Sequence, residues 1–288
     1  MIMMGGGESD TVHSSGADET PNTTPFLVDT HAHLQWPSLL ADVDAVLARA
    51  HDAGVRRILT LGTDPASCRA AVDLAARHTG VYAAVGVHPS DVADDAGAAL
   101  DSLAPLLDHP RVVAIGETGL DYYHDDNPPR ALQRASFERH LDLAARTGKP
   151  ICIHSRESND DVLRLLDARA GRVTAILHCY TGGLETARRA LGMGCYLSFA
   201  GNATYPKLRD LLAVATAIPA DRLLFETDAP FLAPQSRRGR RNEPANVVYT
   251  YDAIAAARGV TRAELGALVG ANAARLFHWG GAHGEDAA

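Results

Sequence analysis

Short apolar runs alternate with longer, helix-like segments over most of this chain. The runs lie at residues 26–29, 57–61, 81–87, 112–115, 151–153, 173–177, 195–199 and 223–225. Most of them are continuously apolar rather than alternating between apolar and polar residues, which is typical of strands buried on both faces of a parallel sheet. The pattern therefore predicts eight parallel strands.

The segments between and after these runs show the periodicity of amphipathic helices. The clearest cover residues 39–53, 68–77, 131–147, 161–170, 245–258 and 262–276. Glycines placed to end helices precede the next strand at Gly54, Gly80, Gly148, Gly171 and Gly194. Eight strands with intervening helices predict an α/β protein built as a single (β/α)₈ TIM barrel. The alternative is an open, doubly wound sheet, which often has a glycine-rich phosphate loop after its first strand, and no G-x-G-x-x-G is present there.

Composition indicates where the folded domain begins and ends, and net charge limits the kind of surface that it presents. Residues 1–25 are predicted to be a disordered N-terminal tail and residues 280–288 a flexible C-terminal tail, which leaves residues 26–279 for the barrel. With 46% hydrophobic residues, the chain can form a large core. A formal net charge of -8 argues against a broad basic surface for duplex DNA. An enzyme that takes one strand end into a metal pocket is still allowed, because bound cations offset carboxylates locally.

The cysteines and the apolar segments indicate the compartment. The four cysteines, Cys68, Cys152, Cys179 and Cys195, form no C-x-x-C pair. This spacing predicts free thiols rather than a disulfide framework or a thiolate zinc site. The N-terminus lacks the pattern of a signal peptide, and no apolar run approaches the roughly 18 residues of a membrane span. We therefore expect a cytoplasmic protein without a membrane segment, and no feature predicts an obligatory protein partner.

Residues of metal-ligand type follow five of the eight predicted strands. They are His31 and His33 after the first strand, Glu117 after the fourth, His154 after the fifth, His178 after the sixth and Asp228 after the eighth. Each alone has an ordinary structural interpretation, such as a histidine bonded to a loop carbonyl or an aspartate that caps a helix. In a barrel, however, all strands end on one face, where unpaired buried charge is costly and a shared cation would satisfy the whole set. The six side chains together predict a metal site.

The ligand types limit the metal. Imidazoles and carboxylates without thiolates suit Zn²⁺, Mn²⁺, Co²⁺ or Fe²⁺, and in part Mg²⁺. Six ligands are too many for one tetrahedral ion with an open position, but they suit two ions that share a bridging carboxylate. Glu117, in the middle of the chain order, is the candidate bridge. We expect two divalent ions per chain, with Mg²⁺, Mn²⁺ and Zn²⁺ as the candidates.

The segments around these candidate ligands resemble motifs of the TatD family of metal-dependent deoxyribonucleases. The resemblance extends from about Phe26 to Trp279 and rests on D-T-H-A-H-L (29–34), G-V-H-P (86–89), G-E-T-G-L-D-Y-Y (116–123), K-P-I-C-I-H-S-R (149–156), H-C-Y-T-G (178–182), E-T-D-A-P (226–230) and R-N-E-P-A-N-V (241–247). It implies that His31, His33 and Asp228 hold one ion and that His154 and His178 hold the other, with Glu117 between them. It also implies a 3′→5′ exonuclease that takes a DNA strand end as substrate. The main departure is Tyr180, where phenylalanine is common.

Phosphodiester hydrolysis by a metal-activated water would give several residues a role. Asp228 is expected to accept the proton of the water as general base, with Glu117 as the catalytic bridge. Arg156, two residues after a candidate ligand, is expected to contact a phosphate oxygen. His88, after the third strand, and Arg241, from the arginine run at residues 237–241, are further candidates for substrate binding. Such a charge run is usually only a solvated surface.

Other functions remain compatible with these residues. An amidohydrolase-like enzyme acting on a small substrate would keep the barrel, although many binuclear relatives of that type bridge their metals with a modified lysine where this chain has Glu117. An aminoacyl-tRNA deacylase is compatible with the arginines, and RNA is possible as a substrate besides DNA. The intact ligand set argues against a non-catalytic metal-binding or interaction protein.

Overall fold

A computed structural model describes residues 26–93 and 96–279 of the chain. The predicted tails, residues 1–25 and 280–288, lie outside the described residues, so the domain boundaries stay predictions.

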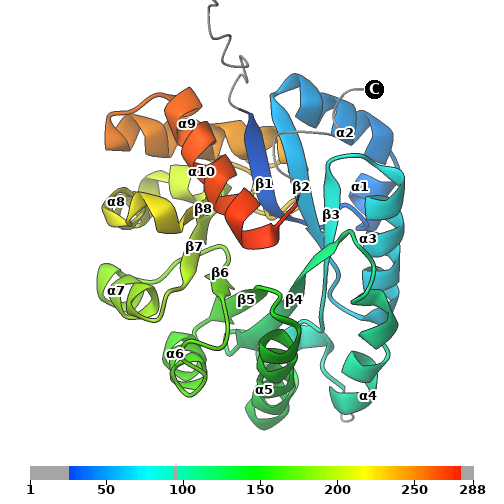
Figure 1. The fold of residues 1–288 in the computed structure, drawn as a ribbon. Helices are drawn as coiled ribbons and strands as arrows, with labels where there is room; N and C mark the ends of the chain where they lie inside the picture. The colour runs from blue at the N-terminus through cyan, green and yellow to red at the C-terminus, as the bar shows by residue number, and fades with distance from the viewer. Residues whose placement is uncertain (1–25, 94–95, 280–288) are drawn as a thin grey trace, which may run out of the picture.

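Eight parallel strands form one sheet in which each strand pairs with the next along the chain (Figure 1). They are β1 (Leu27–Ala32), β2 (Val55–Leu61), β3 (Val81–Val85), β4 (Val112–Asp121), β5 (Ile151–Arg156), β6 (Ala175–Leu177), β7 (Tyr196–Phe199) and β8 (Leu223–Phe225). A bridge between Ala32 and Ala229 joins the end of β1 to the segment after β8 and brings the sheet round into a barrel. The predicted fold is confirmed, and the doubly wound alternative, in which the strand order reverses, is wrong.

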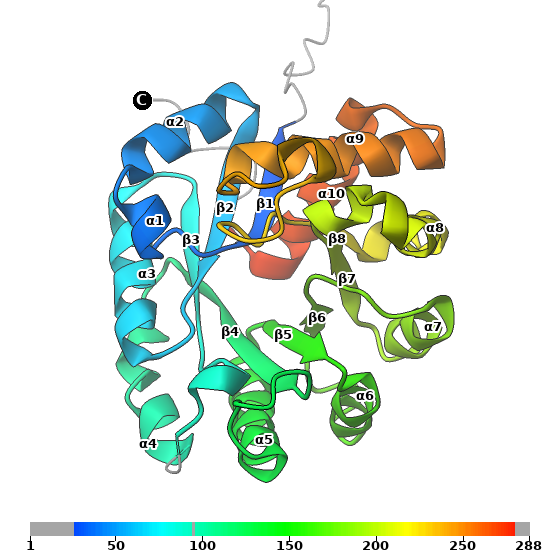
Figure 2. The same ribbon diagram turned by 180° about the vertical axis from the view of Figure 1, so that it is seen from behind.

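Helices surround the strands, and α10 lies across one end of the barrel (Figures 1 and 2). The α-helices of the described residues are α1 (Pro37–Leu40), α2 (Val43–Asp52), α3 (Pro65–Arg77), α4 (Ala96–Asp101), α5 (Arg130–Thr147), α6 (Asn159–Asp167), α7 (Leu184–Gly192), α8 (Arg209–Ala217), α9 (Val247–Arg258) and α10 (Arg262–Phe277). Short 3₁₀ helices are η1 (Pro89–Asp91), η2 (Ala104–Leu106), η3 (Gly201–Thr204), η4 (Pro206–Leu208), η5 (Ala220–Arg222), η6 (Gln235–Arg237) and η7 (Pro244–Asn246). The side chain of Asn272 in α10 donates to the carbonyl of Leu223, where β8 begins, at 2.9 Å. α10 therefore covers the end at which the strands begin, and the opposite end carries the site.

Local sequence signals explain where helices begin and end. The carboxylate of Asp64 accepts hydrogen bonds from the backbone N–H groups of Ala66 and Ser67, and the Ser67 hydroxyl accepts one from the Asp64 N–H. This capping box, with Pro65 in the first turn, starts α3. α5 ends at Gly148, which has φ +68° and adopts the left-handed conformation without the steric cost of a Cβ. The other four glycines predicted to end helices also have positive φ.

Two elements differ from the expected pattern. β4 has ten residues and extends well beyond the expected 112–115, because Glu117 and Asp121 are polar yet buried in the strand. Polar residues after an apolar run are read as the end of a strand, so a strand that enters a polar site is predicted too short. The helix expected over 39–53 is divided into α1 and α2, because Asp42 leaves the helical conformation with φ -137°.

Side chains make most of the joint between β1 and β8. The buried hydroxyl of Tyr251, in α9, accepts a hydrogen bond from the Val28 N–H at 3.3 Å and donates to the Val28 carbonyl at 3.2 Å. Asp29 accepts a hydrogen bond from the Thr227 N–H at 2.9 Å. Burial raises the pKa of Asp29 to about 8, so its carboxyl is held neutral at pH 7. β1, which leads into two predicted metal ligands, is thus positioned by α9 and by the segment after β8.

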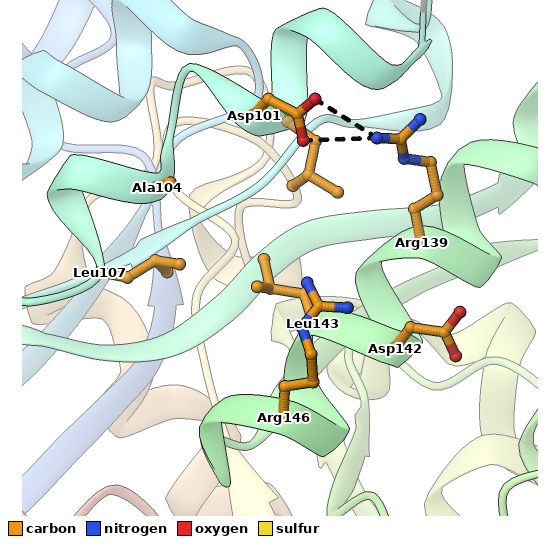
Figure 3. Close-up of a pocket in the computed structure, with 8 residues that line it drawn as sticks. Asp101, Ala104, Leu107, Arg139, Asp142, Leu143 and Arg146 are labelled. Carbon is orange, nitrogen blue, oxygen red and sulfur yellow. Dashed lines mark hydrogen bonds and ion pairs between the residues drawn. The ribbon is translucent and has the colours of Figure 1, made fainter.

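The apolar side chains of the described residues pack between the strands and the surrounding helices. Within residues 26–93 and 96–279, no helix has the length and apolar character of a membrane-spanning segment. A cavity of about 160 Å³ lies between α4, η2 and α5, where Asp101 and Arg139 form an ion pair at 3.3 Å (Figure 3). None of the predicted site residues lines this cavity.

Candidate metal centre

All six predicted ligands meet at the carboxyl end of the barrel. His31 lies in β1 and His33 just after it, Glu117 lies within β4, His154 lies in β5, and His178 and Asp228 follow β6 and β8. Three overlapping groups bring a ligand atom of each member within 4.8 Å of the others: His31, His178 and Asp228; His31, His33 and Glu117; and His88, Glu117 and His154. The expectation that catalytic-type groups gather at one end of the strands therefore agrees with the geometry, although Glu117 lies inside its strand rather than at its end.

The first ligand group consists of His31, His33, Asp228 and one oxygen of Glu117. The Nε2 atoms of His31 and His33 are 3.3 Å apart, and they lie 3.3 and 3.4 Å from Glu117 Oε2. Asp228 Oδ1 lies 3.7 and 3.4 Å from the same two nitrogens. Ligands at about 2.0–2.1 Å from a tetrahedral ion are separated by about 3.4 Å. These four atoms therefore fit around one divalent ion.

The second ligand group consists of His154, His178 and the other oxygen of Glu117. Glu117 Oε1 lies 3.1 Å from His154 Nδ1 and 3.0 Å from His178 Nε2, and the two nitrogens are 3.3 Å apart. His88 Nε2 lies 3.5 Å from the same oxygen. Because its two oxygens face different groups, Glu117 has the geometry of a bridging carboxylate.

The second ring nitrogen of three imidazoles is also bonded. His33 Nδ1 donates to the Leu61 carbonyl at 2.9 Å, His178 Nδ1 bonds Glu226 Oε1 at 3.1 Å, and His154 Nε2 bonds Asp121 Oδ2 at 3.3 Å. Such partners fix the tautomer and orientation of a ligand imidazole and make it more basic. Each ring is thereby positioned with its free nitrogen facing the centre.

The sequence pattern assigned no role to Asp121 or Glu226. A signal was present in the sequence, because each lies an even number of residues from a predicted ligand, although only Glu117 and Asp121 share a strand. Asp121 is four residues after Glu117, and Glu226 is two residues before Asp228. Along a strand such as β4, residues at even spacing face the same side.

Charge in the centre is balanced between buried carboxylates and imidazoles. Burial opposes ionisation of Glu117, but the neighbouring imidazoles, that of His178 foremost, outweigh it and hold the pKa of Glu117 well below its usual value. Burial likewise opposes ionisation of Asp228, and the hydrogen bond from His33 with the nearby imidazoles lowers its pKa overall. Burial lowers the pKa of His178, yet Glu117 and Glu226 raise it well above the ordinary value. The buried carboxylates and imidazoles together form a donor set of the kind that holds divalent cations.

The turn after β8 sets the direction of Asp228. Its φ of +55° lies in the left-handed region, which aspartate tolerates better than most residues other than glycine. The side-chain amide of buried Asn242 donates to the carbonyls of Thr227 and Phe231 at 2.9 and 2.6 Å. The Asn242 side chain thereby holds the loop backbone before and after Asp228.

The predicted substrate residues His88 and Arg156 lie beside the second ligand group. Burial lowers the pKa of His88 to about 3, so its imidazole is neutral at pH 7 next to Glu117. Arg156, the last residue of β5, is exposed, and its guanidinium lies 4.0 Å from the ring centroid of Tyr123. Among the described residues it has no carboxylate partner. Arg156 is therefore free to bind an anion.

Arg241 has partners that the sequence pattern does not show. Its guanidinium donates to both carboxylate oxygens of Asp42, at 2.7 and 3.0 Å, and to the backbone carbonyl of Ser38. The arginine therefore joins the loop after β8 to α1 and to the start of α2. Figure 2 shows α1 and α2 beside each other. Contact between Arg241 and substrate stays a prediction.

Comparison with known proteins decides the family. The model of the family described as TatD related DNase matches residues 28–278. The chain belongs to the TatD family. The Bacillus subtilis protein named "uncharacterized metal-dependent hydrolase YabD" is 40% identical over 253 residues, which cover 88% of this chain and 99% of the relative. The Cronobacter sakazakii protein named "3'-5' ssDNA/RNA exonuclease TatD" is 39% identical over 245 residues, which cover 82% and 92%.

A solved structure agrees with this assignment. The crystal structure of YJJV, a TatD homologue from Escherichia coli K12, matches with a TM-score of 0.82 at 30% identity and covers 88% of this chain and 98% of its own. The predicted family and barrel are thus confirmed, and the chain is a metal-dependent hydrolase of the TatD type. Tyr180, the departure from the family motif, is buried, and its hydroxyl donates to the Gly183 carbonyl at 2.7 Å.

Proposed function

We propose that this TatD-family hydrolase is a two-metal 3′→5′ exonuclease that removes nucleotides from the ends of single strands of DNA or RNA. The observation that carries the proposal is the position of Glu117, whose two oxygens face two ligand groups of three or four donor atoms. Two ions held by these groups would suit in-line displacement at a phosphodiester, because such a pair stabilises both the attacking and the leaving oxygen. The nuclease name of relatives that are 35–39% identical supports the same bond.

Different side chains are proposed to bind the metal ions, accept a proton and bind the phosphate. His31, His33, Asp228 and Glu117 would hold one ion, and His154, His178 and Glu117 the other. Bound ions lower the pKa of a coordinated water toward neutrality. Asp228, whose pKa the hydrogen bond from His33 and the nearby imidazoles lower despite burial, would accept a proton from the attacking water at a carboxylate oxygen. Arg156 binds a non-bridging phosphate oxygen through its unpaired guanidinium.

Mg²⁺, Mn²⁺ and Zn²⁺ are the proposed ions, two per chain. The donor set contains nitrogen and oxygen but no thiolate, although Cys179 follows His178 directly. This composition suits Mn²⁺ and Zn²⁺ and allows Mg²⁺. A cytoplasmic location is proposed with it, since all four cysteines are free thiols.

The test compares strand ends. Metal-free protein is reloaded with each ion and incubated with 5′-labelled linear single-stranded DNA, RNA of the same sequence, circular single-stranded DNA and a strand with a blocked 3′ end. We expect both linear strands to shorten from the 3′ end to mononucleotides, while the circular and blocked strands persist. The Asp228→Ala variant serves as the inactive control. Because few phosphates are contacted, activity should fall only shallowly with salt.

Two outcomes would contradict the proposal. Cleavage of the circular and blocked strands as fast as the free-ended strand would make the enzyme an endonuclease. A charged tRNA included beside the strands tests the deacylase alternative, which would release the amino acid without shortening any strand.

A further inference from the structure

Exposed aromatic side chains gather at the metal end of the barrel. The chain has two tryptophans, eight tyrosines and six phenylalanines, and all of them lie in the described residues. Only Trp36, Tyr123 and Phe231 are exposed, at 39%, 52% and 45%. They follow β1, β4 and β8, the strands that carry or precede His31, Glu117 and Asp228. A single exposed aromatic needs no explanation, but the restriction of all three to one end of the barrel indicates a binding surface.

Trp36 and Phe231 form a corner beside the first ligand group. Their ring centroids are 5.4 Å apart and their planes are inclined by 74°. Both rings also lie against the imidazole of His33, with centroid distances of 6.3 and 6.2 Å. A flat ligand placed in this corner would meet the face of one ring and the edge of the other, next to a metal ligand.

Tyr123 lies on the side of the second ligand group. Its N–H donates to Asp121, the carboxylate that bonds His154, and its ring carries the guanidinium of Arg156. This side therefore offers an aromatic ring together with an unpaired cation. On the Trp36 side, by contrast, Arg241 is already bonded to Asp42 and to the carbonyl of Ser38.

We propose that the corner of Trp36 and Phe231 binds the base of the 3′-terminal nucleotide, while the rest of the strand passes Tyr123 and Arg156. The proposal rests on the proposed exonuclease function and names the substrate group that each side takes. The terminal nucleoside has no phosphate beyond it, so its subsite needs aromatic surface and no cation. The strand on the other side of the scissile bond carries further phosphates, and the free guanidinium lies there.

The chemistry of stacking determines the specificity. Every base has a π-face, so an aromatic corner accepts all four bases with little preference. The base must nevertheless be unstacked and unpaired to enter, which selects single-stranded ends. A terminal nucleotide that lacks its base would lose the contact while keeping every phosphate.

The test measures binding separately from cleavage. Strands with a non-hydrolysable methylenephosphonate at the last linkage and a 5′ fluorophore are titrated into metal-loaded enzyme by anisotropy. One strand carries a normal 3′-terminal base, one lacks that base, and one lacks a base five positions upstream. A fourth carries 2-aminopurine at the 3′ end, whose emission falls on stacking. We expect loss of the terminal base to weaken binding about 5- to 150-fold, equivalent to ~1–3 kcal/mol per stacked base, and loss of the upstream base to change it less.

Matched variants locate the contact. Trp36→Leu and Phe231→Leu keep apolar surface but remove the π-face, so they should bind the normal strand as weakly as the strand without its terminal base and abolish the quenching. Trp36→Phe should restore both. Val260→Ala, which alters an exposed apolar residue between α9 and α10, should match the wild type.

The outcomes separate this proposal from the proposed function. Equal affinity for the normal and terminally abasic strands, or unchanged quenching in Trp36→Leu, would overturn the terminal-base subsite even if the enzyme shortens linear strands. Base-dependent binding that Trp36→Leu removes would support the subsite even if no strand is cleaved, in which case the proposed exonuclease function fails alone.

Discussion

At the scale of single residues, Glu117 has the widest consequences for the site. Its Oε2 lies 3.3 and 3.4 Å from the first two imidazoles, and its Oε1 lies 3.0 and 3.1 Å from the other two. Each oxygen thus completes a different ligand group. Asp228, by contrast, lies 3.7 and 3.4 Å from the imidazoles of His31 and His33 through one oxygen only, Oδ1.

Glu117→Ala should therefore lose both ions rather than one. We expect less than one divalent ion per chain after reloading and dialysis, and a fall in activity larger than the roughly 10- to 100-fold that loss of an outer partner of a metal ligand costs. Elemental analysis and kcat/KM on a linear strand provide the measurements. Glu138→Ala, which removes an exposed carboxylate on α5, is the matched control. Two ions retained with near wild-type turnover would place the bridge elsewhere.

At the scale of elements, α9 supplies hydrogen-bond partners to the backbone of β1 on the side that faces β8. In the described part of the chain, the backbone contact of β1 with the segment after β8 is the bridge between Ala32 and Ala229, with hydrogen bonds from the His33 N–H to the Ala229 carbonyl and from the Asp228 N–H to the His31 carbonyl. Between these strands the Tyr251 hydroxyl replaces a neighbouring strand by bonding both backbone groups of Val28. A helix that contributes none of the six candidate ligands therefore helps to position the strand that contains His31 and precedes His33.

Tyr251→Phe should destabilise the protein without a large change in its shape. Two buried backbone groups of Val28 would lose a partner, and each unsatisfied group costs about 1–3 kcal/mol. The free energy of unfolding in urea measures the loss. Tyr249→Phe, two residues earlier in α9, removes a half-buried hydroxyl bonded to Arg237 and should change stability by less than about 0.5 kcal/mol. Equal losses of unfolding free energy in the two variants would mean that the Tyr251 hydroxyl does not stabilise the contact between α9 and β1.

A second element contact makes stability depend on pH. His140, buried in α5, accepts a hydrogen bond from the Val87 N–H at 3.0 Å. Burial lowers the pKa of His140 from 6.5 to about 4. Because the unfolded chain binds a proton there before the folded one does, stability falls as the pH falls from 6.5 to 4, by up to about 3 kcal/mol from this group.

His140→Gln should remove this part of the pH dependence. In urea unfolding with chelator present, the variant should lose less stability than the wild type between pH 6.5 and pH 4.5, even if it is less stable at pH 7. Parallel stability curves for the two proteins would show that His140 takes up its proton equally in the folded and unfolded states.

At the scale of the whole molecule, the fold and the cluster of six candidate ligands were predictable because both leave strong local signals. Buried parallel strands appear as apolar runs, and His, Glu and Asp at their ends appear as breaks in those runs. The partners of Arg241 were not predictable, since Asp42 lies 199 residues away in sequence and a run of arginines does not show which member is paired. The exposure of Trp36 and Phe231 depends on how loops from two ends of the chain meet, which no local pattern contains.

Metal binding should stabilise the entire barrel, because the ligands come from β1, β4, β5, β6 and β8 or the residues just after them. An ion present at 100 times its dissociation constant adds about 2.7 kcal/mol, which corresponds to a rise in Tm of about 5–10 °C for a domain of this size. Thermal unfolding with and without Mn²⁺ measures the shift. Glu117→Ala should show little shift, and an equal rise in that variant would mean that the ion binds outside this centre.

The contact between Tyr251 and β1 also bears on the order of folding and metal binding during translation. Asp228 is the last of the six ligands, and Tyr251 and Asn272 follow it. A nascent chain that already contains every ligand therefore still lacks the helices that fix β1 and cover the start of β8. Since synthesis proceeds at about 5–20 residues per second, the remaining segment takes a few seconds to appear. Stable metal loading should accordingly follow translation of α10 rather than accompany emergence of the ligands themselves.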